Sequence, residues 1–128
     1  MTGIVRGIDH LVLTVRDVEA SVRFYARALG LEAVTFAGTR RALLAGRQKI
    51  NLQTLGQETR NHAAIGAGDL CLEAAVPLAA VIERLEGAGV AIVEGPVAKS
   101  GARGPIRSVY FNDPDGNLVE VSTYGDEG

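Results

Sequence analysis

The sequence predicts an α+β fold made of two tandem β-α-β-β-β modules, and two observations support this prediction. The first is an internal repeat: when the chain is shifted by about 59 residues against itself, Gly30 falls on Gly89, and such self-similarity indicates a duplicated unit. The second is the turn sequence Asp113-Pro114-Asp115-Gly116 between two apolar runs, which is typical of a β-hairpin. The predicted single domain covers residues 1–128, as modules 8–56 and 69–124 joined by a loop over 57–68.

The first half is predicted to form a strand, a helix and then three strands. Residues 8–15 alternate as a strand that carries His10 and Thr14 on one face. Asp17 is a suitable N-cap for a helix that runs to about Leu29, and Gly30 is a natural stop. Further strands are expected over residues 31–36, 41–44 and 49–55, with glycines between them.

The second half repeats this order. A strand is expected over residues 69–74, a helix from Pro77 to about Glu86, a strand over 90–93, a glycine-rich basic loop over 99–105, and then the closing hairpin. Because side chains alternate along a strand, Glu120 shares a face with Leu118 and Ser122. A carboxylate in the middle of an enclosed strand needs a partner, and a metal ion is one candidate.

Composition excludes several classes of protein. A hydrophobic fraction of 47% with 22% charged residues indicates a globular chain rather than a disordered one. The formal net charge of -2 gives no electrostatic basis for binding nucleic acid. Cys71 is the single cysteine, which excludes an intramolecular disulfide and a cysteine-cluster zinc site. No stretch is long and apolar enough for a membrane span, so we expect a soluble, cytoplasmic protein with no nucleic-acid or membrane partner.

Three motifs resemble the vicinal oxygen chelate superfamily. They are Ile8-Asp9-His10 followed by Asp17, Ser21 to Tyr25 ending in Leu29-Gly30-Leu31, and Val109 to Glu120 around the predicted turn. This superfamily includes glyoxalase I, extradiol dioxygenases and bleomycin-binding proteins. Segments 49–52 and 94–106 further resemble its glyoxalase domain-containing, virulence-type branch. The resemblance implies the glyoxalase/bleomycin resistance/dioxygenase fold, in which paired modules form a curled mixed sheet cup.

The resemblance also implies metal ligands on the first and last strands of each module. Carried over residue by residue, these are His10, Asp69 and Glu120, with either Asn51 or Gln53 as a fourth. Asp69 departs from the histidine common in the family, and the Asn51 position departs from a glutamate. Nitrogen and oxygen donors of this kind suit Fe, Mn, Ni, Co or Zn as a divalent ion. In the alternative reading, Asp69 binds the 66–68 loop and His10 pairs with Glu120 without metal.

Further site residues follow from strand alternation and local charge. Ser108 and Tyr110 are expected on the cup face, where Tyr110 could donate a hydrogen bond to a substrate and act with Glu120 in catalysis. Thr14 shares the face of His10, and Arg103 could hold an anionic group at the mouth of the cup. The other reading for Arg103 is a cation of a solvated basic loop.

Two functions are consistent with these residues. The first is a metal-dependent enzyme of the lyase, isomerase or dioxygenase-like kind that acts on a small oxygenated substrate. The second is a non-enzymatic protein that binds a small molecule or antibiotic, as bleomycin-binding relatives do. In both cases the resemblance implies a homodimer.

Overall fold

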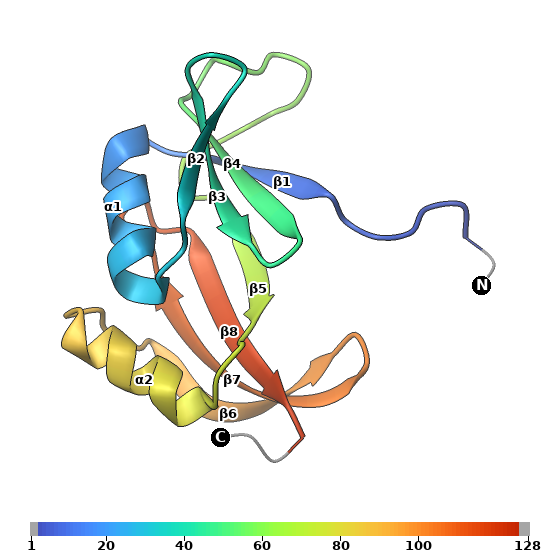
Figure 1. Cartoon of the computed structure of the whole chain (residues 1–128), viewed down its shortest axis with the longest axis vertical. Coiled ribbons are helices and arrows are strands. Elements are labelled where there is room, and N and C mark those ends of the chain that lie inside the picture. The colour runs from blue at the N-terminus through green and yellow to red at the C-terminus, as the bar shows by residue number, and fades with distance from the viewer. Residues whose placement is uncertain (1–2, 126–128) are drawn as a thin grey trace.

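The computed structural model describes residues 3–125, and this part of the chain contains two helices and eight strands (Figure 1). The order is β1 (His10–Thr14), α1 (Val18–Leu29), β2 (Ala33–Phe36), β3 (Arg40–Ala45), β4 (Gln48–Gln53), β5 (Asp69–Glu73), α2 (Leu78–Gly87), β6 (Glu94–Gly101), β7 (Gly104–Asn112) and β8 (Leu118–Tyr124). Each half therefore supplies one β-α-β-β-β unit. Over residues 3–125, neither helix is long and apolar enough to cross a membrane.

The strands form two four-stranded mixed sheets, one from each half of the chain. Sheet A has the order β1-β4-β3-β2, and sheet B has the order β5-β8-β7-β6. In each sheet the first strand pairs parallel with its neighbour, and the remaining pairs are antiparallel. Both sheets stay open, so β1 and β5 are edge strands while β4 and β8 are interior. This confirms the predicted α+β class and places Glu120 on an interior strand.

Helix α1 begins and ends at the residues that the sequence predicts. The Asp17 side chain accepts a hydrogen bond from the Ala20 amide at 3.0 Å, which satisfies one of the free donors of the first turn. Gly30 adopts φ 70°, a left-handed conformation that glycine reaches without strain. The helix buries Phe24 and Tyr25 in the core that the two halves share.

The prediction for residues 90–105 is wrong in detail. The expected strand 90–93 lies before β6, and most of the expected loop 99–105 belongs to the β6–β7 hairpin, because Val97 to Gly101 pair antiparallel with β7. The register shifts between Glu94 and Val97. At this bulge Gly95 has φ 110°, and a Cβ there would lie 2.4 Å from the Ser108 carbonyl oxygen. Glycine therefore permits the close approach of two strands, which its sequence context did not indicate.

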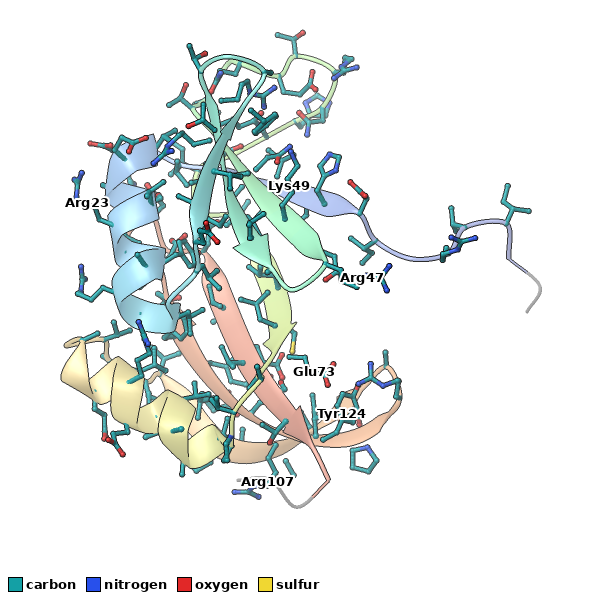
Figure 2. The ribbon with its side chains drawn as sticks, viewed as in Figure 1. Arg23, Arg47, Lys49, Glu73, Arg107 and Tyr124 are labelled. Carbon is teal, nitrogen blue, oxygen red and sulfur yellow. The ribbon has the colours of Figure 1, made fainter. Side chains whose placement is uncertain are left out.

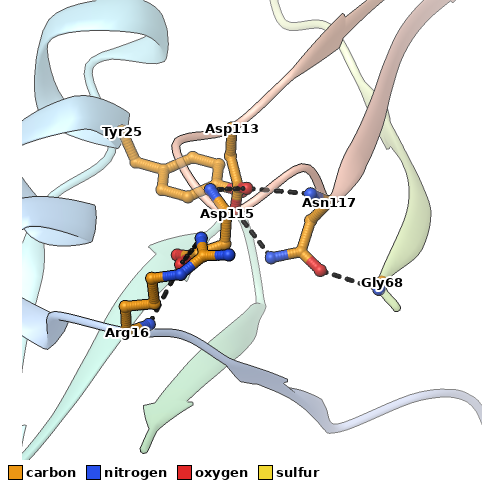
Figure 3. A network of polar contacts seen from close by, with 6 residues as sticks. All are labelled: Arg16, Tyr25, Gly68, Asp113, Asp115 and Asn117. Atoms are coloured by element: carbon orange, nitrogen blue, oxygen red, sulfur yellow. Dashed lines mark hydrogen bonds and ion pairs between the residues drawn. The ribbon is translucent and has the colours of Figure 1, made fainter. Parts of the chain in front are cut away.

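A polar network joins the first helix to the last hairpin (Figure 3). The buried Tyr25 hydroxyl donates to Asp113 Oδ2 at 2.7 Å, and the Asn117 side-chain amide donates to the same oxygen at 2.9 Å. Asn117 Oδ1 in turn accepts a bond from the Gly68 amide at 2.7 Å. The loop before β5 is therefore bound by Asn117. The alternative prediction, in which Asp69 binds the 66–68 loop, is wrong. The network fixes the β7–β8 turn against both halves of the chain.

Candidate metal and ligand site

The candidate residues lie on the sheet faces opposite the helix-facing core. In sheet A, His10, Thr14, Asn51 and Gln53 share one face, because Val12 pairs with Asn51 and Thr14 with Gln53 in register. Leu13, Ile50 and Leu52 on the other face belong to the buried core. In sheet B the corresponding face carries Asp69, Cys71, Ser108, Tyr110, Glu120 and Ser122. The predicted assignment of side chains to faces is therefore correct.

Glu120 is held by hydroxyl groups from its own sheet. The Ser108 hydroxyl donates to Glu120 Oε2 at 2.6 Å, and the Ser122 hydroxyl donates to the same oxygen at 3.3 Å. Ser108 and Ser122 are buried and lie 2.7 Å apart through their hydroxyl oxygens. Over residues 3–125, Glu120 makes no ion pair. The carboxylate is thus oriented by neutral donors and is not neutralised by a cation of the described chain.

Tyr110 lies opposite Glu120 in the β7–β8 register. Burial, and then the hydrogen bond to Glu120, raise the pKa of Tyr110 to about 12. The phenol is therefore protonated at neutral pH and is a hydrogen-bond donor. Its ring contacts Lys99, whose Nζ lies 5.4 Å from the ring centre. Donation by Tyr110 to a substrate, the role predicted for it, stays a prediction.

Asn51 and Gln53 differ in their side-chain contacts. Gln53 Nε2 donates to Thr14 Oγ1 at 3.0 Å, so both predicted site residues are engaged with each other. Asn51 is 6% exposed, and its Oδ1 accepts no hydrogen bond in the described part of the chain. In the strand register, Asn51 lies opposite Val12 in sheet A, and Glu120 lies opposite Cys71 in sheet B. Asn51 is therefore the residue of the first module that corresponds to Glu120 in the second. These contacts favour Asn51 over Gln53 as the fourth ligand.

The predicted ligands do not gather within one chain. His10 is exposed, and its Nδ1 lies 2.8 Å from Asp9 Oδ2. Asp69 is exposed and makes no side-chain hydrogen bond within residues 3–125. No three His, Cys, Asp or Glu side chains in that range lie close enough to hold a metal ion. The donor types still fit a divalent ion, since Asn51 Oδ1 has no hydrogen-bond partner within residues 3–125 and the Glu120 carboxylate is bonded by hydroxyl groups but not by a cation of that range.

Two cations of the predicted basic loop, Arg103 and Lys99, form ion pairs with carboxylates of the same chain. Arg103 donates to Glu73 Oε1 at 2.9 Å, and Lys99 Nζ lies 3.2 Å from Glu94 Oε2. The backbone amide of Arg103 also donates to the Tyr124 hydroxyl at 3.1 Å. Substrate binding by Arg103 remains a prediction that would require the Glu73 pair to open.

Three further residues on the His10 face of sheet A were not predicted as site residues: Phe36, Arg40 and Lys49. Lys49 lies opposite His10 in register, and Phe36 lies opposite Arg40. Both cations contact the Phe36 ring. Side-chain alternation, followed from His10 through β4, β3 and β2, could have placed these three residues on one face. Whether the two cations reach the Phe36 ring depends on the curl of the sheet, which alternation does not predict.

Comparison with known proteins agrees with this architecture. Residues 7–121 match the model of the Glyoxalase/Bleomycin resistance protein/Dioxygenase superfamily. The virulence protein STM3117 of Salmonella typhimurium is 48% identical over 124 residues, which cover 94% of this chain and 86% of that protein. The chain therefore belongs to the Glyoxalase/Bleomycin resistance protein/Dioxygenase superfamily.

Solved structures show the same fold at two levels of sequence identity. An integron cassette protein, VCH_CASS1 of V. cholerae, has a TM-score of 0.91 at 45% identity, with 98% of this chain and 100% of that chain covered. A lactoylglutathione lyase from Agrobacterium tumefaciens has a TM-score of 0.72 at 26% identity, with 95% and 96% covered.

Proposed function

We propose that this protein is a metal-dependent enzyme of the vicinal oxygen chelate type, acting on a small oxygenated substrate by lyase, isomerase or dioxygenase-like chemistry. The observation that carries the proposal is Glu120. Its carboxylate lies in the middle of an interior strand, and its partners in the described chain are hydroxyl groups. A carboxylate so placed is suited to bind a cation or to accept a proton from a bound molecule.

The divalent ion would be shared between the two sheet faces. Sheet A offers His10 and Asn51 Oδ1, which accepts no hydrogen bond in the described part of the chain, with Gln53 as the other candidate. Sheet B offers Asp69 and Glu120. Fe, Mn, Ni, Co or Zn would accept this set of one imidazole and several oxygens. When bound, the ion would supply Lewis-acid polarisation of substrate oxygens.

The residues around Glu120 would bind and orient the substrate. Tyr110 is a protonated phenol at neutral pH, and its O–H, bonded to Glu120 in the free protein, would turn to donate a hydrogen bond to a substrate oxygen. Ser108 holds Glu120 Oε2, so the carboxylate keeps one orientation while it accepts a proton. Thr14 would contact the substrate from sheet A, where its hydroxyl already meets Gln53.

A second copy of the chain would bring the two faces together. The edge strands β1 and β5 have one unpaired side each. Between them and α2 lies a groove of about 740 Å³, whose lining is largely apolar and includes Leu11, Leu31, Leu72 and Val76. Residues 3–7 extend away from the rest of the chain and expose Ile4 and Val5 (Figure 1), whereas Ile8 is exposed but lines the groove. Apolar surface on an arm and in a groove of the same protein is suited to a homodimer.

The metal content of purified protein tests the proposal. We expect about one first-row ion per chain, lost in both His10→Ala and Glu120→Ala. Mixed dimers of these two variants are the sharper test, because a site shared between chains leaves one site with both substitutions and the other with none. The mixed dimer should then regain about half of the wild-type metal. A monomer in solution, or no regain in the mixed dimer, would contradict the shared site.

Capture of a small molecule or antibiotic without chemistry is the second candidate function. The observation that supports it is the exposed Asp69, at a position where the family commonly has histidine, because a carboxylate there binds softer ions less well than an imidazole does. A dimer that stays free of metal after loading with several divalent ions would support ligand capture and contradict the enzyme.

A further inference from the structure

The ring of Phe36 lies in contact with two cations. The Nζ atom of Lys49 is 3.5 Å from the ring centre, and the guanidinium carbon of Arg40 is 5.2 Å from it. Each contact is favourable as a cation–π interaction. Two like charges on one partly buried ring nevertheless repel each other, and this repulsion is relieved most directly by an anion between or beside them.

Neither cation has an anionic partner in the described chain. Over residues 3–125, no carboxylate lies within ion-pair distance of Lys49 or Arg40. Arg40 Nε is buried and donates no hydrogen bond in this part of the chain. The neighbouring Arg41 contrasts with it, since its guanidinium donates to Glu19 at 3.0 Å and to Thr35 at 2.9 Å. A buried donor without an acceptor is costly, so an acceptor atom from a bound anion would stabilise it.

This cluster lies on the face of sheet A that carries His10 and Asn51. Lys49 is opposite His10 in register, and Asn51 is the next residue of β4 on the same face. Phe36 and Lys49 come from opposite ends of the face, and Ala42 and Asn51 lie between them and are buried. The contact between Phe36 and Lys49 therefore spans the position of Asn51, whose Oδ1 accepts no hydrogen bond within residues 3–125.

We propose that Phe36, Arg40 and Lys49 form an oxyanion-binding site that holds the carboxylate or phosphate of the substrate on the face of sheet A that also carries His10. The inference rests on the proposed function, because it assigns the anionic end of the molecule whose other oxygens would meet the metal. Arg40 offers a planar guanidinium and its free Nε donor, and Lys49 offers a point charge on a long stem. The net charge of -2 does not attract anions to the molecule as a whole, so affinity must come from this cluster.

Titration with inorganic phosphate and with glycolate, followed by amide NMR in the presence of a metal chelator, tests the site. We expect saturable shifts confined to residues near 36–41 and 48–51, and none with the neutral methyl ester of glycolate. Lys49→Gln and Arg40→Gln should each weaken binding by about five- to tenfold, since each removes one charge-assisted contact. Lys49→Arg, which keeps the charge, should retain most of the affinity, and the amide spectrum of Lys49→Gln shows directly whether that variant is folded.

Arg47 and Arg23 provide matched controls (Figure 2). Arg47 is an exposed cation of the same hairpin, and Arg23 is exposed on α1, on the other side of the molecule. Neither Arg47→Gln nor Arg23→Gln should change the affinity. If Arg47→Gln weakens binding as much as Lys49→Gln, or if the shifts spread over other cations, the site does not exist. Because the chelator removes metal, loss of the metal site alone leaves this titration unchanged, so the two proposals fail separately.

Discussion

At the scale of single residues, the Tyr25 hydroxyl joins the two halves of the chain. It is buried and donates to Asp113 Oδ2 at 2.7 Å. Tyr25→Phe should lower the free energy of unfolding by about 1.5–3 kcal/mol, because the bond is to a carboxylate and the partner stays buried. Urea denaturation measures this. Tyr124→Phe is the control: its hydroxyl accepts a bond from the Arg103 amide near the surface, so a smaller loss is expected, and equal losses would contradict the special role of Tyr25.

The same residue predicts a pH dependence. Burial first, and then Asp113, raise the pKa of Tyr25 far above its ordinary value of 10.0. In the unfolded chain the phenol ionises near pH 10, whereas in the folded chain it stays protonated. Its contribution is therefore complete below about pH 10 and is lost as pH rises beyond it, since the folded state then binds more protons.

Comparison of wild type with Tyr25→Phe isolates this contribution, because the other tyrosines are common to both. The stability difference between the two proteins should be constant from pH 7 to 9 and should shrink at about pH 11. A difference that stays constant to that pH would show that Tyr25 titrates normally in the folded chain.

At the scale of elements, the bulge at Gly95 sets how closely β6 approaches β7. Alanine there would combine φ 110° with a Cβ 2.4 Å from the Ser108 carbonyl oxygen. Gly95→Ala should therefore cost about 2–4 kcal/mol of stability, and should disturb the strand that carries Ser108 and Tyr110. Thermal unfolding together with the amide spectrum of β7 measures both effects.

Gly87 is the matched control for that substitution. It is the last residue of α2, and a Cβ there would meet nothing within 4 Å. Gly87→Ala should stabilise the protein slightly, by up to about 1 kcal/mol, because alanine favours helix and restricts the unfolded chain. If both alanines had the same effect, the close approach at Gly95 would not be the cause.

At the scale of the whole molecule, residues 3–9 are predicted to contact a second copy. Val5→Asp places a charge on an exposed apolar residue of this arm. It should weaken the dimer by about tenfold or more, since a buried unpaired charge costs over 1 kcal/mol. Analytical ultracentrifugation over a concentration series measures this. Leu55→Asp, on an exposed leucine after β4, should leave association unchanged.

How far the site could be predicted differs between its residues. The face of His10 or Glu120 follows from alternation, because the period of a strand is two and the turn at Asp113 sets the register. The pairing of Arg103 with Glu73, and the contact of Lys49 with Phe36, could not be predicted this way. Both depend on how far each sheet curls and on which long side chains then meet.

By itself the sequence determined the α+β class, the two β-α-β-β-β units, the caps of α1, and the faces of the candidate ligands. These are local or periodic properties, and alternation, turn chemistry and an internal repeat express them directly. Only the tertiary structure decided that Asn51 Oδ1 accepts no hydrogen bond within residues 3–125 while Gln53 bonds Thr14, and that no three His, Cys, Asp or Glu side chains of this range gather into a metal site. The physical reason is that hydrogen bonding and the gathering of side chains depend on the relative placement of two separate sheets, which no local pattern encodes.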